Sequence, residues 1–283
     1  MSDEKIKKVT VPFLRKMKKK GMKITALTAY DFPTAKIVDQ AGIDVILVGD
    51  SLGMVVLGYE NTIPVTMDEM IHHTKAVARA VKRALIVGDM PYFSYHLSSE
   101  ETVLNASRFL KEAGANAVKI EGASEKRLEL IKAMIEADIP VMGHVGLTPQ
   151  SIYHGGGFKV KGKELEEAKQ IVRMAVDLEK AGVFAVVLEC VPMELAKIIT
   201  RRLEIPTIGI GAGPLCDGQI LVFHDLVGYS NGYMPKFVKR YAELYEILNK
   251  AVQCYIEDVK SESFPEDKYS YHFKSKKDLK ELK

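Results

Sequence analysis

Val45-Ile46-Leu47-Val48-Gly49-Asp50-Ser51 is a run of branched aliphatic residues that ends in a glycine followed by polar residues. Similar apolar runs, each ending at a polar residue with glycine or cysteine nearby, recur at residues 85–89, 117–122, 141–144 and 185–190. Continuous apolar runs of this length are typical of parallel strands that are buried on both faces. In a barrel of such strands, the residues at the carboxyl ends all face one site.

Segments with helical spacing of apolar residues separate these runs. We expect strands at residues 24–29, 43–48, 84–88, 117–120, 140–143, 183–188 and 207–210. Strands that alternate with helices indicate a parallel sheet with right-handed crossovers. Because seven strands precede residue 211 and no GxGxxG follows the first of them, the pattern favours a (β/α)8 TIM barrel over an open doubly wound sheet.

The eighth strand is ambiguous in the sequence. Ile220, Phe223 and Val227 have helical spacing, which predicts a helix over 217–227 and leaves Phe237-Val238, within 237–240, as strand eight. The alternative is a strand over 220–223.

The segment before the first strand has an apolar face among lysines. Phe13, Leu14 and Met17 form this face, and we expect a helix there that closes the bottom of the barrel. We expect residues 1–260 to form a single catalytic barrel and residues 261–283 a polar C-terminal tail.

Composition excludes several classes of protein. The 283 residues carry a net charge of only +3, which argues against a nucleic-acid partner. No apolar stretch approaches the ~20 residues that span a bilayer, so we expect no membrane partner. The three cysteines, Cys190, Cys216 and Cys254, contain no CxxC pair, which argues against structural zinc and favours a cytoplasmic protein.

Four charged residues at the predicted strand ends are candidates for a metal site and a buried charged pair. Asp50 and Asp89 end neighbouring strands, where two carboxylates suit a hard divalent cation such as Mg2+; the alternative is that each caps the following helix. Lys119 and Glu121 lie two residues apart, so both point to the same face of their strand. They form either a charged pair inside the barrel or an ordinary salt bridge at its rim.

Two further strand-end residues complete the candidate site. Glu189 follows a markedly apolar run, where poor solvation of a carboxylate suits a general base; a structural ion pair is the alternative. His144 is equally compatible with a structural and a catalytic role. The residues alone therefore predict a site that combines a metal with acid–base groups, and proton removal next to a carbonyl is its natural reaction.

Several long motifs resemble the ketopantoate hydroxymethyltransferase family over residues 10–258. They are Thr28-Ala29-Tyr30-Asp31, Val48-Gly49-Asp50-Ser51-Leu52-Gly53-Met54-Val55, Gly88-Asp89-Met90-Pro91, Val118-Lys119-Ile120-Glu121-Gly122, Gly143-His144-Val145-Gly146-Leu147-Thr148-Pro149-Gln150 and Cys216-Asp217-Gly218-Gln219-Ile220-Leu221-Val222. One departure is Phe93, which stands where the family usually has glycine.

The resemblance implies a TIM barrel of the phosphoenolpyruvate mutase/isocitrate lyase-like superfamily. It implies transfer of a hydroxymethyl group from 5,10-methylenetetrahydrofolate to 3-methyl-2-oxobutanoate, giving 2-dehydropantoate for pantothenate and coenzyme A biosynthesis through a metal-stabilised enolate. It further implies one Mg2+ per subunit, folate as co-substrate and a cytoplasmic homodecamer built as a pentamer of dimers. The alternative is a carbon–carbon lyase or phosphomutase of the same superfamily acting on a 2-oxo acid.

The resemblance also implies a role for each strand-end residue. Glu189 matches the catalytic proton acceptor. The metal ligands match Asp50, Asp89 and Glu121. The substrate-binding residues match Ser51, Lys119, His144, Asp50 and Asp89. No segment identifies the residues that bind folate.

Overall fold

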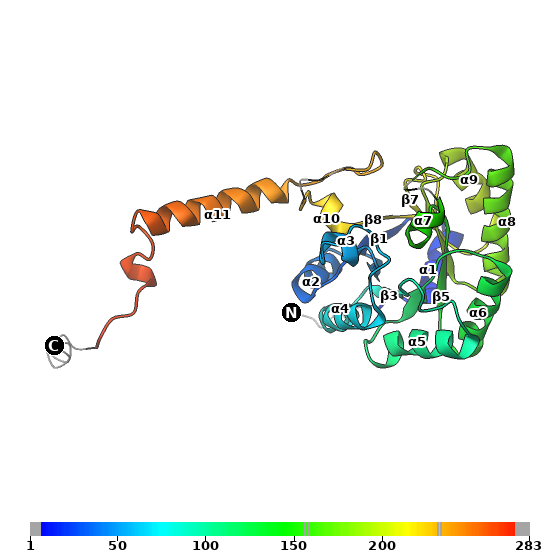
Figure 1. Ribbon diagram of the computed structural model, residues 1–283, viewed down its shortest axis with the longest axis horizontal. Coiled ribbons are helices and arrows are strands. Elements are labelled where there is room, and N and C mark those ends of the chain that lie inside the picture. The colour runs from blue at the N-terminus through cyan, green and yellow to red at the C-terminus, as the bar shows by residue number, and fades with distance from the viewer. Residues whose placement is uncertain (1–6, 156, 158, 231, 233, 275–283) are drawn as a thin grey trace.

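Eight parallel strands form a closed barrel in the computed structural model, which describes residues 7–155, 157, 159–230, 232 and 234–274 (Figure 1). Each strand pairs with the next, and the last pairs with the first. The strands are β1 (Ile24–Thr28), β2 (Val45–Val48), β3 (Leu85–Asp89), β4 (Ala117–Lys119), β5 (Val141–Gly146), β6 (Ala185–Glu189), β7 (Thr207–Ile210) and β8 (Gly218–Leu221). The predicted (β/α)8 fold is confirmed.

Helices cover the outside of the barrel. The long ones are α2 (Phe32–Gln40), α4 (Met67–Ala80), α5 (Ser99–Lys111), α6 (Glu125–Glu136), α8 (Leu165–Ala181) and α9 (Met193–Arg202). The short ones are α3 (Leu52–Val55), α7 (Ile152–Gly155), α10 (Phe223–Leu226) and the 3-10 turn Pro149–Ser151, whereas the 3-10 turn Asp267–Tyr269 lies away from the barrel in the C-terminal extension (Figure 1). Local sequence fixes several helix starts. At α4, for example, the Thr66 hydroxyl accepts from the Glu69 backbone N–H while the Glu69 carboxylate accepts from that of Thr66.

The interior of the barrel is filled by side chains and closed at one end by α1 (Val11–Lys19). Leu14 and Met17 of this helix are buried in the same apolar cluster as the inward-facing strand residues. Lys18 Nζ also donates to Asp217 Oδ2 at 2.9 Å, just before β8. The structure thus confirms the predicted helix at the bottom of the barrel.

The preferred prediction for strand eight was wrong, and the alternative lay close to the truth. β8 spans Gly218–Leu221 and pairs with β7 and β1, whereas residues 237–240 form no strand. The predicted helix over 217–227 is reduced to α10. Asp217 does not cap a helix but accepts from Lys18 and from the backbone N–H and hydroxyl of Thr207, which fixes the start of the strand.

Gly88 shows one physical reason for a glycine before a strand-end acid. A Cβ atom at this position would overlap the Phe109 ring of α5. The missing side chain therefore lets the helix pack directly on β3 beside Asp89, so this glycine serves close helix–strand packing.

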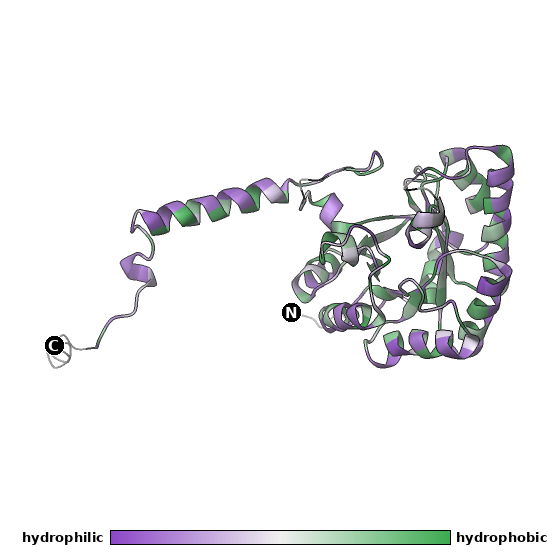
Figure 2. Cartoon of the chain, in the orientation of Figure 1, coloured by the Kyte–Doolittle hydropathy of each residue, from purple (hydrophilic) through white to green (hydrophobic). Residues whose placement is uncertain are grey.

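The helix α11 (Leu244–Lys260) leaves the barrel and projects away from it (Figure 1). All its residues after Leu244 are exposed, although Figure 2 shows hydrophobic residues along its length. The large exposed apolar side chains are Tyr245, Ile247, Leu248, Val252, Tyr255, Ile256 and Val259. No helix in the described part of the chain is long and apolar enough to cross a bilayer.

Candidate active site

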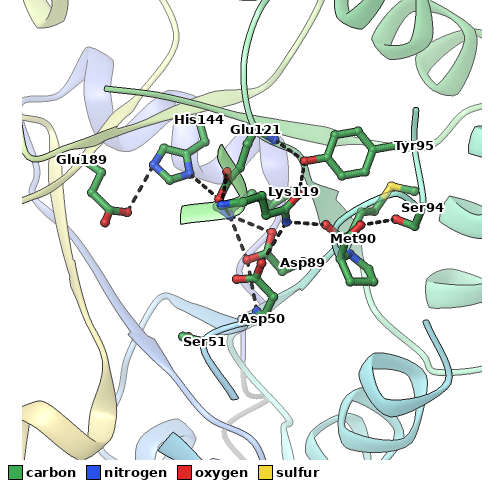
Figure 3. Close-up of polar contacts among 12 residues, drawn as sticks. Asp50, Ser51, Asp89, Met90, Ser94, Tyr95, Lys119, Glu121, His144 and Glu189 are labelled. Atoms are coloured by element: carbon green, nitrogen blue, oxygen red, sulfur yellow. Dashed lines mark hydrogen bonds and ion pairs between the residues drawn. The ribbon is translucent and has the colours of Figure 1, made fainter. Parts of the chain in front are cut away.

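The strand period places the charged residues directly above the apolar interior of the barrel. Val87, Ala117, Met142 and Val187 belong to the interior cluster on four neighbouring strands. Side chains two positions apart on a strand point to the same side. The residues two positions further along these strands are Asp89, Lys119, His144 and Glu189, which the structure brings together at the carboxyl ends (Figure 3).

Lys119 is the positive centre of this group. Its Nζ donates to both carboxylate oxygens of Asp89, at 2.7 and 2.8 Å, and lies 4.0 Å from Glu121 Oε1. Burial lowers the pKa of Lys119, but the carboxylates of Asp89, Glu121 and Asp50 outweigh it and raise the pKa above its ordinary value. The Lys119 and Glu121 side chains therefore point into the barrel, and the rim salt bridge does not form.

One lysine does not compensate three buried carboxylates. Asp50, Asp89 and Glu121 are all buried, and the Asp50 backbone N–H donates to Asp89 Oδ2 at 3.3 Å. Burial, followed by the charge of Asp89, raises the pKa of Asp50 well above its usual range. Burial also raises the pKa of Asp89, with Lys119 opposing the shift. We call these three residues, together with Lys119, the strand-end cluster.

His144 lies between two carboxylates. Its Nδ1 is 3.6 Å from Glu121 Oε1 and its Nε2 is 3.3 Å from Glu189 Oε2 (Figure 3). Burial lowers the pKa of His144, but contact with Glu121 and Glu189 raises it to about 9. Glu189 has the more open side chain of the two, with 16% exposed against 4% for Glu121. A substrate that enters from the barrel mouth can therefore approach Glu189.

Ser51 follows β2 beside the cluster. Its hydroxyl lies 2.8 Å from the hydroxyl of Tyr30, which is fully buried. The backbone carbonyl of Tyr30 in turn lies 2.6 Å from His73 Nδ1. Burial raises the pKa of Tyr30 above its ordinary value, so its hydroxyl stays protonated, and either hydroxyl can be the donor of this hydrogen bond. When Tyr30 donates, the Ser51 proton can point to another acceptor.

The donor atoms of the cluster suit a hard divalent cation. Asp50, Asp89 and Glu121 present carboxylate oxygens, and Glu121 Oε1 is buried without a hydrogen-bond partner. Magnesium prefers such oxygen ligands and usually keeps several waters. In the described part of the chain, no three His, Cys, Asp or Glu side chains are already arranged as a metal shell. Both oxygens of Asp89 are instead engaged by Lys119.

Reasoning from strand ends missed two residues that contact this cluster. Gln150 follows β5 and Tyr95 follows β3, and both are buried. Gln150 Nε2 donates to Asp50 Oδ2 at 2.9 Å, and the Tyr95 hydroxyl donates to Gln150 Oε1. Both lie in loops without periodic burial. The one available signal was the place of Gln150 in the motif that follows His144.

Solved structures share this architecture at low sequence identity. Phosphonopyruvate hydrolase in complex with oxalate and Mg2+ matches with a TM-score of 0.60 and 16% identity, over 96% of this chain and 94% of that one. A 2,3-dimethylmalate lyase, described as a phosphoenolpyruvate mutase/isocitrate lyase superfamily member, matches with a TM-score of 0.60 and 14% identity, over 90% and 86%. These likenesses concern the fold alone.

Sequence relatives are much closer. The 3-methyl-2-oxobutanoate hydroxymethyltransferase of Thermoanaerobacter sp. (strain X514) is 60% identical over 264 residues, which is 93% of this chain and 96% of the relative. The enzyme of that name from Syntrophomonas wolfei is 55% identical over 267 residues, 94% and 96% of the two chains. Residues 8–267 match the ketopantoate hydroxymethyltransferase family. The chain therefore belongs to the ketopantoate hydroxymethyltransferase family.

Proposed function

We propose that this protein transfers a hydroxymethyl group from 5,10-methylenetetrahydrofolate to 3-methyl-2-oxobutanoate and releases 2-dehydropantoate. Water supplies the hydroxyl oxygen, because the folate delivers its carbon as a methylene group. The observation that carries the proposal is the cluster of Asp50, Asp89, Lys119 and Glu121 beside His144 and Glu189, in a chain 60% identical to an enzyme of this name.

The positive and hydroxyl groups are suited to the substrate carboxylate. Lys119 is charged and buried, so it offers a strong attraction to an anion in a poorly solvated site. The Ser51 hydroxyl lies 2.8 Å from that of Tyr30, and when Tyr30 is the donor the Ser51 proton is left to donate to the substrate. We assign both residues to substrate binding, with His144 beside them.

We assign to Glu189 the role of the base that removes the proton from C3 of the oxo acid. Its carboxylate lies on the open side of His144, at 3.3 Å from Nε2, and this contact orients it. Water adds to the methylene carbon of the folate, both carbon–nitrogen bonds break and tetrahydrofolate leaves, while the electron pair released at C3 forms the new bond to this carbon. A positioned acid–base group of this kind contributes about 10²–10⁴-fold to the rate.

A divalent cation completes the proposed site. Asp50, Asp89 and Glu121 would hold Mg2+, one per subunit, and we assign Asp50 and Asp89 to substrate binding as well. The ion would supply positive charge where negative charge develops on the substrate. Lys119 would then have to share Asp89, because its ammonium contacts both oxygens of that carboxylate.

Isotope exchange separates this function from the lyase or phosphomutase alternative. The unmodified protein with Mg2+ and 3-methyl-2-oxobutanoate in deuterated water should exchange the C3 proton without folate, measured by proton NMR. Adding 5,10-methylenetetrahydrofolate should then produce 2-dehydropantoate. Glu189→Gln should slow the exchange by at least ~10²-fold. Exchange by Glu189→Gln at the normal rate would make Glu121 the first candidate for the base.

We further propose that the protein assembles into a homo-oligomer, with a pentamer of dimers as the expected form. The exposed apolar residues of α11 support this, since an amphipathic helix that packs extensively against no other helix or strand among the described residues fits a site on another copy. The ring of packed helices runs from α2 through α4, α5, α6 and α8 to α9. Among the described residues, no extensive packing joins α9 to α2, which leaves a place for a helix of a second copy.

Light scattering tests the assembly. The mass should be near ten times the 31.5 kDa of one chain. Val252 is one of the exposed apolar residues of α11, so Val252→Glu should lower the mass. Gln253→Glu adds the same charge at the next position and should leave the mass unchanged. A monomeric unmodified protein would refute the assembly and leave the enzymatic proposal intact.

We also propose that residues 1–260 form the catalytic barrel and residues 261–283 a polar tail.

A further inference from the structure

Gln150 connects two of the proposed metal ligands. Its side-chain amide Nε2 donates to Asp50 Oδ2 at 2.9 Å and to the Met90 carbonyl at 2.9 Å. Its backbone N–H donates to Glu121 Oε2 at 3.1 Å. The side chain is buried, so these contacts do not compete with bulk water. One residue thus holds a carboxylate from the end of β2 and another from the end of β4.

The hydrogen bonds allow only one orientation of this amide. Asp50 Oδ2 and the Met90 carbonyl only accept, so the atom that faces both must be the nitrogen. On the other side, the Tyr95 hydroxyl accepts from the Glu121 backbone N–H at 3.2 Å and gives its own proton to Gln150 Oε1. A flipped amide would therefore lose the hydrogen bonds to Asp50 and to the Met90 carbonyl.

Tyr95 is itself fixed in place. The Arg127 guanidinium lies 4.3 Å from the centre of its ring, and one guanidinium nitrogen donates to the Tyr95 carbonyl. Burial raises the pKa of Tyr95 well above its ordinary value, which keeps the hydroxyl protonated. The chain of donors from the Glu121 backbone through Tyr95 to Gln150 therefore keeps its direction.

We propose that Gln150 is a positioning residue that holds the carboxylates of Asp50 and Glu121 in the arrangement that binds the divalent cation. The proposal rests on the metal assignment under the proposed function. Groups that hydrogen-bond to metal ligands orient them, and their loss typically weakens metal binding by about 10–100-fold. Tyr95 acts one step further out, by orienting the Gln150 amide.

Binding of Mn2+ alone, measured from the electron paramagnetic resonance signal of the free ion, tests this role without turnover. Gln150→Glu keeps the size of the side chain but sets a carboxylate against Asp50 and the Met90 carbonyl. We expect it to weaken Mn2+ binding by at least ~10-fold. Gln170→Glu adds the same charge on the exposed face of α8 and should leave the affinity unchanged.

Tyr95→Phe provides a second, milder test. It removes only the hydroxyl that orients the amide, so it should weaken Mn2+ binding less than Gln150→Glu, and it decides the question if Gln150→Glu does not fold. Urea unfolding of each metal-free variant shows that the protein measured is folded. Unchanged Mn2+ affinity in the folded variants would overturn the role of Gln150. Absence of Mn2+ binding in the unmodified protein would instead overturn the metal assignment itself.

Discussion

Lys119→Met tests whether one buried lysine holds the strand-end cluster together. The Lys119 ammonium lies 2.7 Å from Asp89 Oδ1, with 5% and 2% of the two side chains exposed. At an effective dielectric constant of about 20, opposite unit charges at this distance attract by about 6 kcal/mol. The cost of taking both charges out of water offsets part of this attraction. Removal of one partner from such a pair therefore lowers the free energy of unfolding by about 3–5 kcal/mol.

Urea unfolding at pH 8 in EDTA, followed by circular dichroism, measures this effect. The double variant Lys119→Met with Asp89→Leu removes both charges, so it should recover at least half of the stability lost in the single variant. Two results would refute this reasoning: a loss of less than about 1 kcal/mol in the free energy of unfolding of Lys119→Met, or strictly additive effects of the two substitutions. Either would show that the Lys119–Asp89 pair does not chiefly compensate the buried carboxylates.

Three further outcomes follow from the packing and the electrostatics. Gly88→Ala should lower the free energy of unfolding by about 1–3 kcal/mol in urea, because its Cβ would overlap the Phe109 ring. Phe93→Gly should raise the melting temperature slightly, since Phe93 has a φ of 67° that costs a non-glycine residue about 1 kcal/mol. The folded-state pKa of His144 is raised to about 9. Protonated His144 therefore contributes fully to the free energy of unfolding below about pH 6.5, and this contribution disappears as the pH rises through 9. The metal-free unmodified protein should therefore lose up to about 3 kcal/mol of stability between these pH values, measured by thermal unfolding, and His144→Gln should lack this pH dependence.

The strands were predictable where both faces are buried. β2 is buried at all four positions, and this leaves an unbroken apolar run in the sequence. β8 offers no such run, because Gln219 is exposed and Gly218 contributes no side chain. Its position is set by pairing with β1 and by the contacts of Asp217, which are interactions with distant parts of the chain.

The same distinction applies to the site. Period two along a strand placed Lys119 and Glu121 on one face, and the polar strand ends placed Asp89 near them. Gln150 and Tyr95 could not be found this way, since their contacts depend on how loops meet above the barrel. The bond from Gln150 to Asp50 spans 100 positions, and the bond from Tyr95 to Gln150 spans 55. Such contacts leave no local pattern.

The helix α1 has a consequence for synthesis of the chain. It is synthesised before all eight strands, yet its Lys18 pairs with Asp217, 199 positions later, and its apolar face packs into an interior that is complete only after β8. At about 5–20 residues per second, translation of the intervening chain takes on the order of 10–40 s. During that interval Leu14 and Met17 lack their final partners. The seam between β1 and β8 therefore closes only after β8 has been synthesised, and until then the apolar face of α1 stays without its partners in the barrel interior.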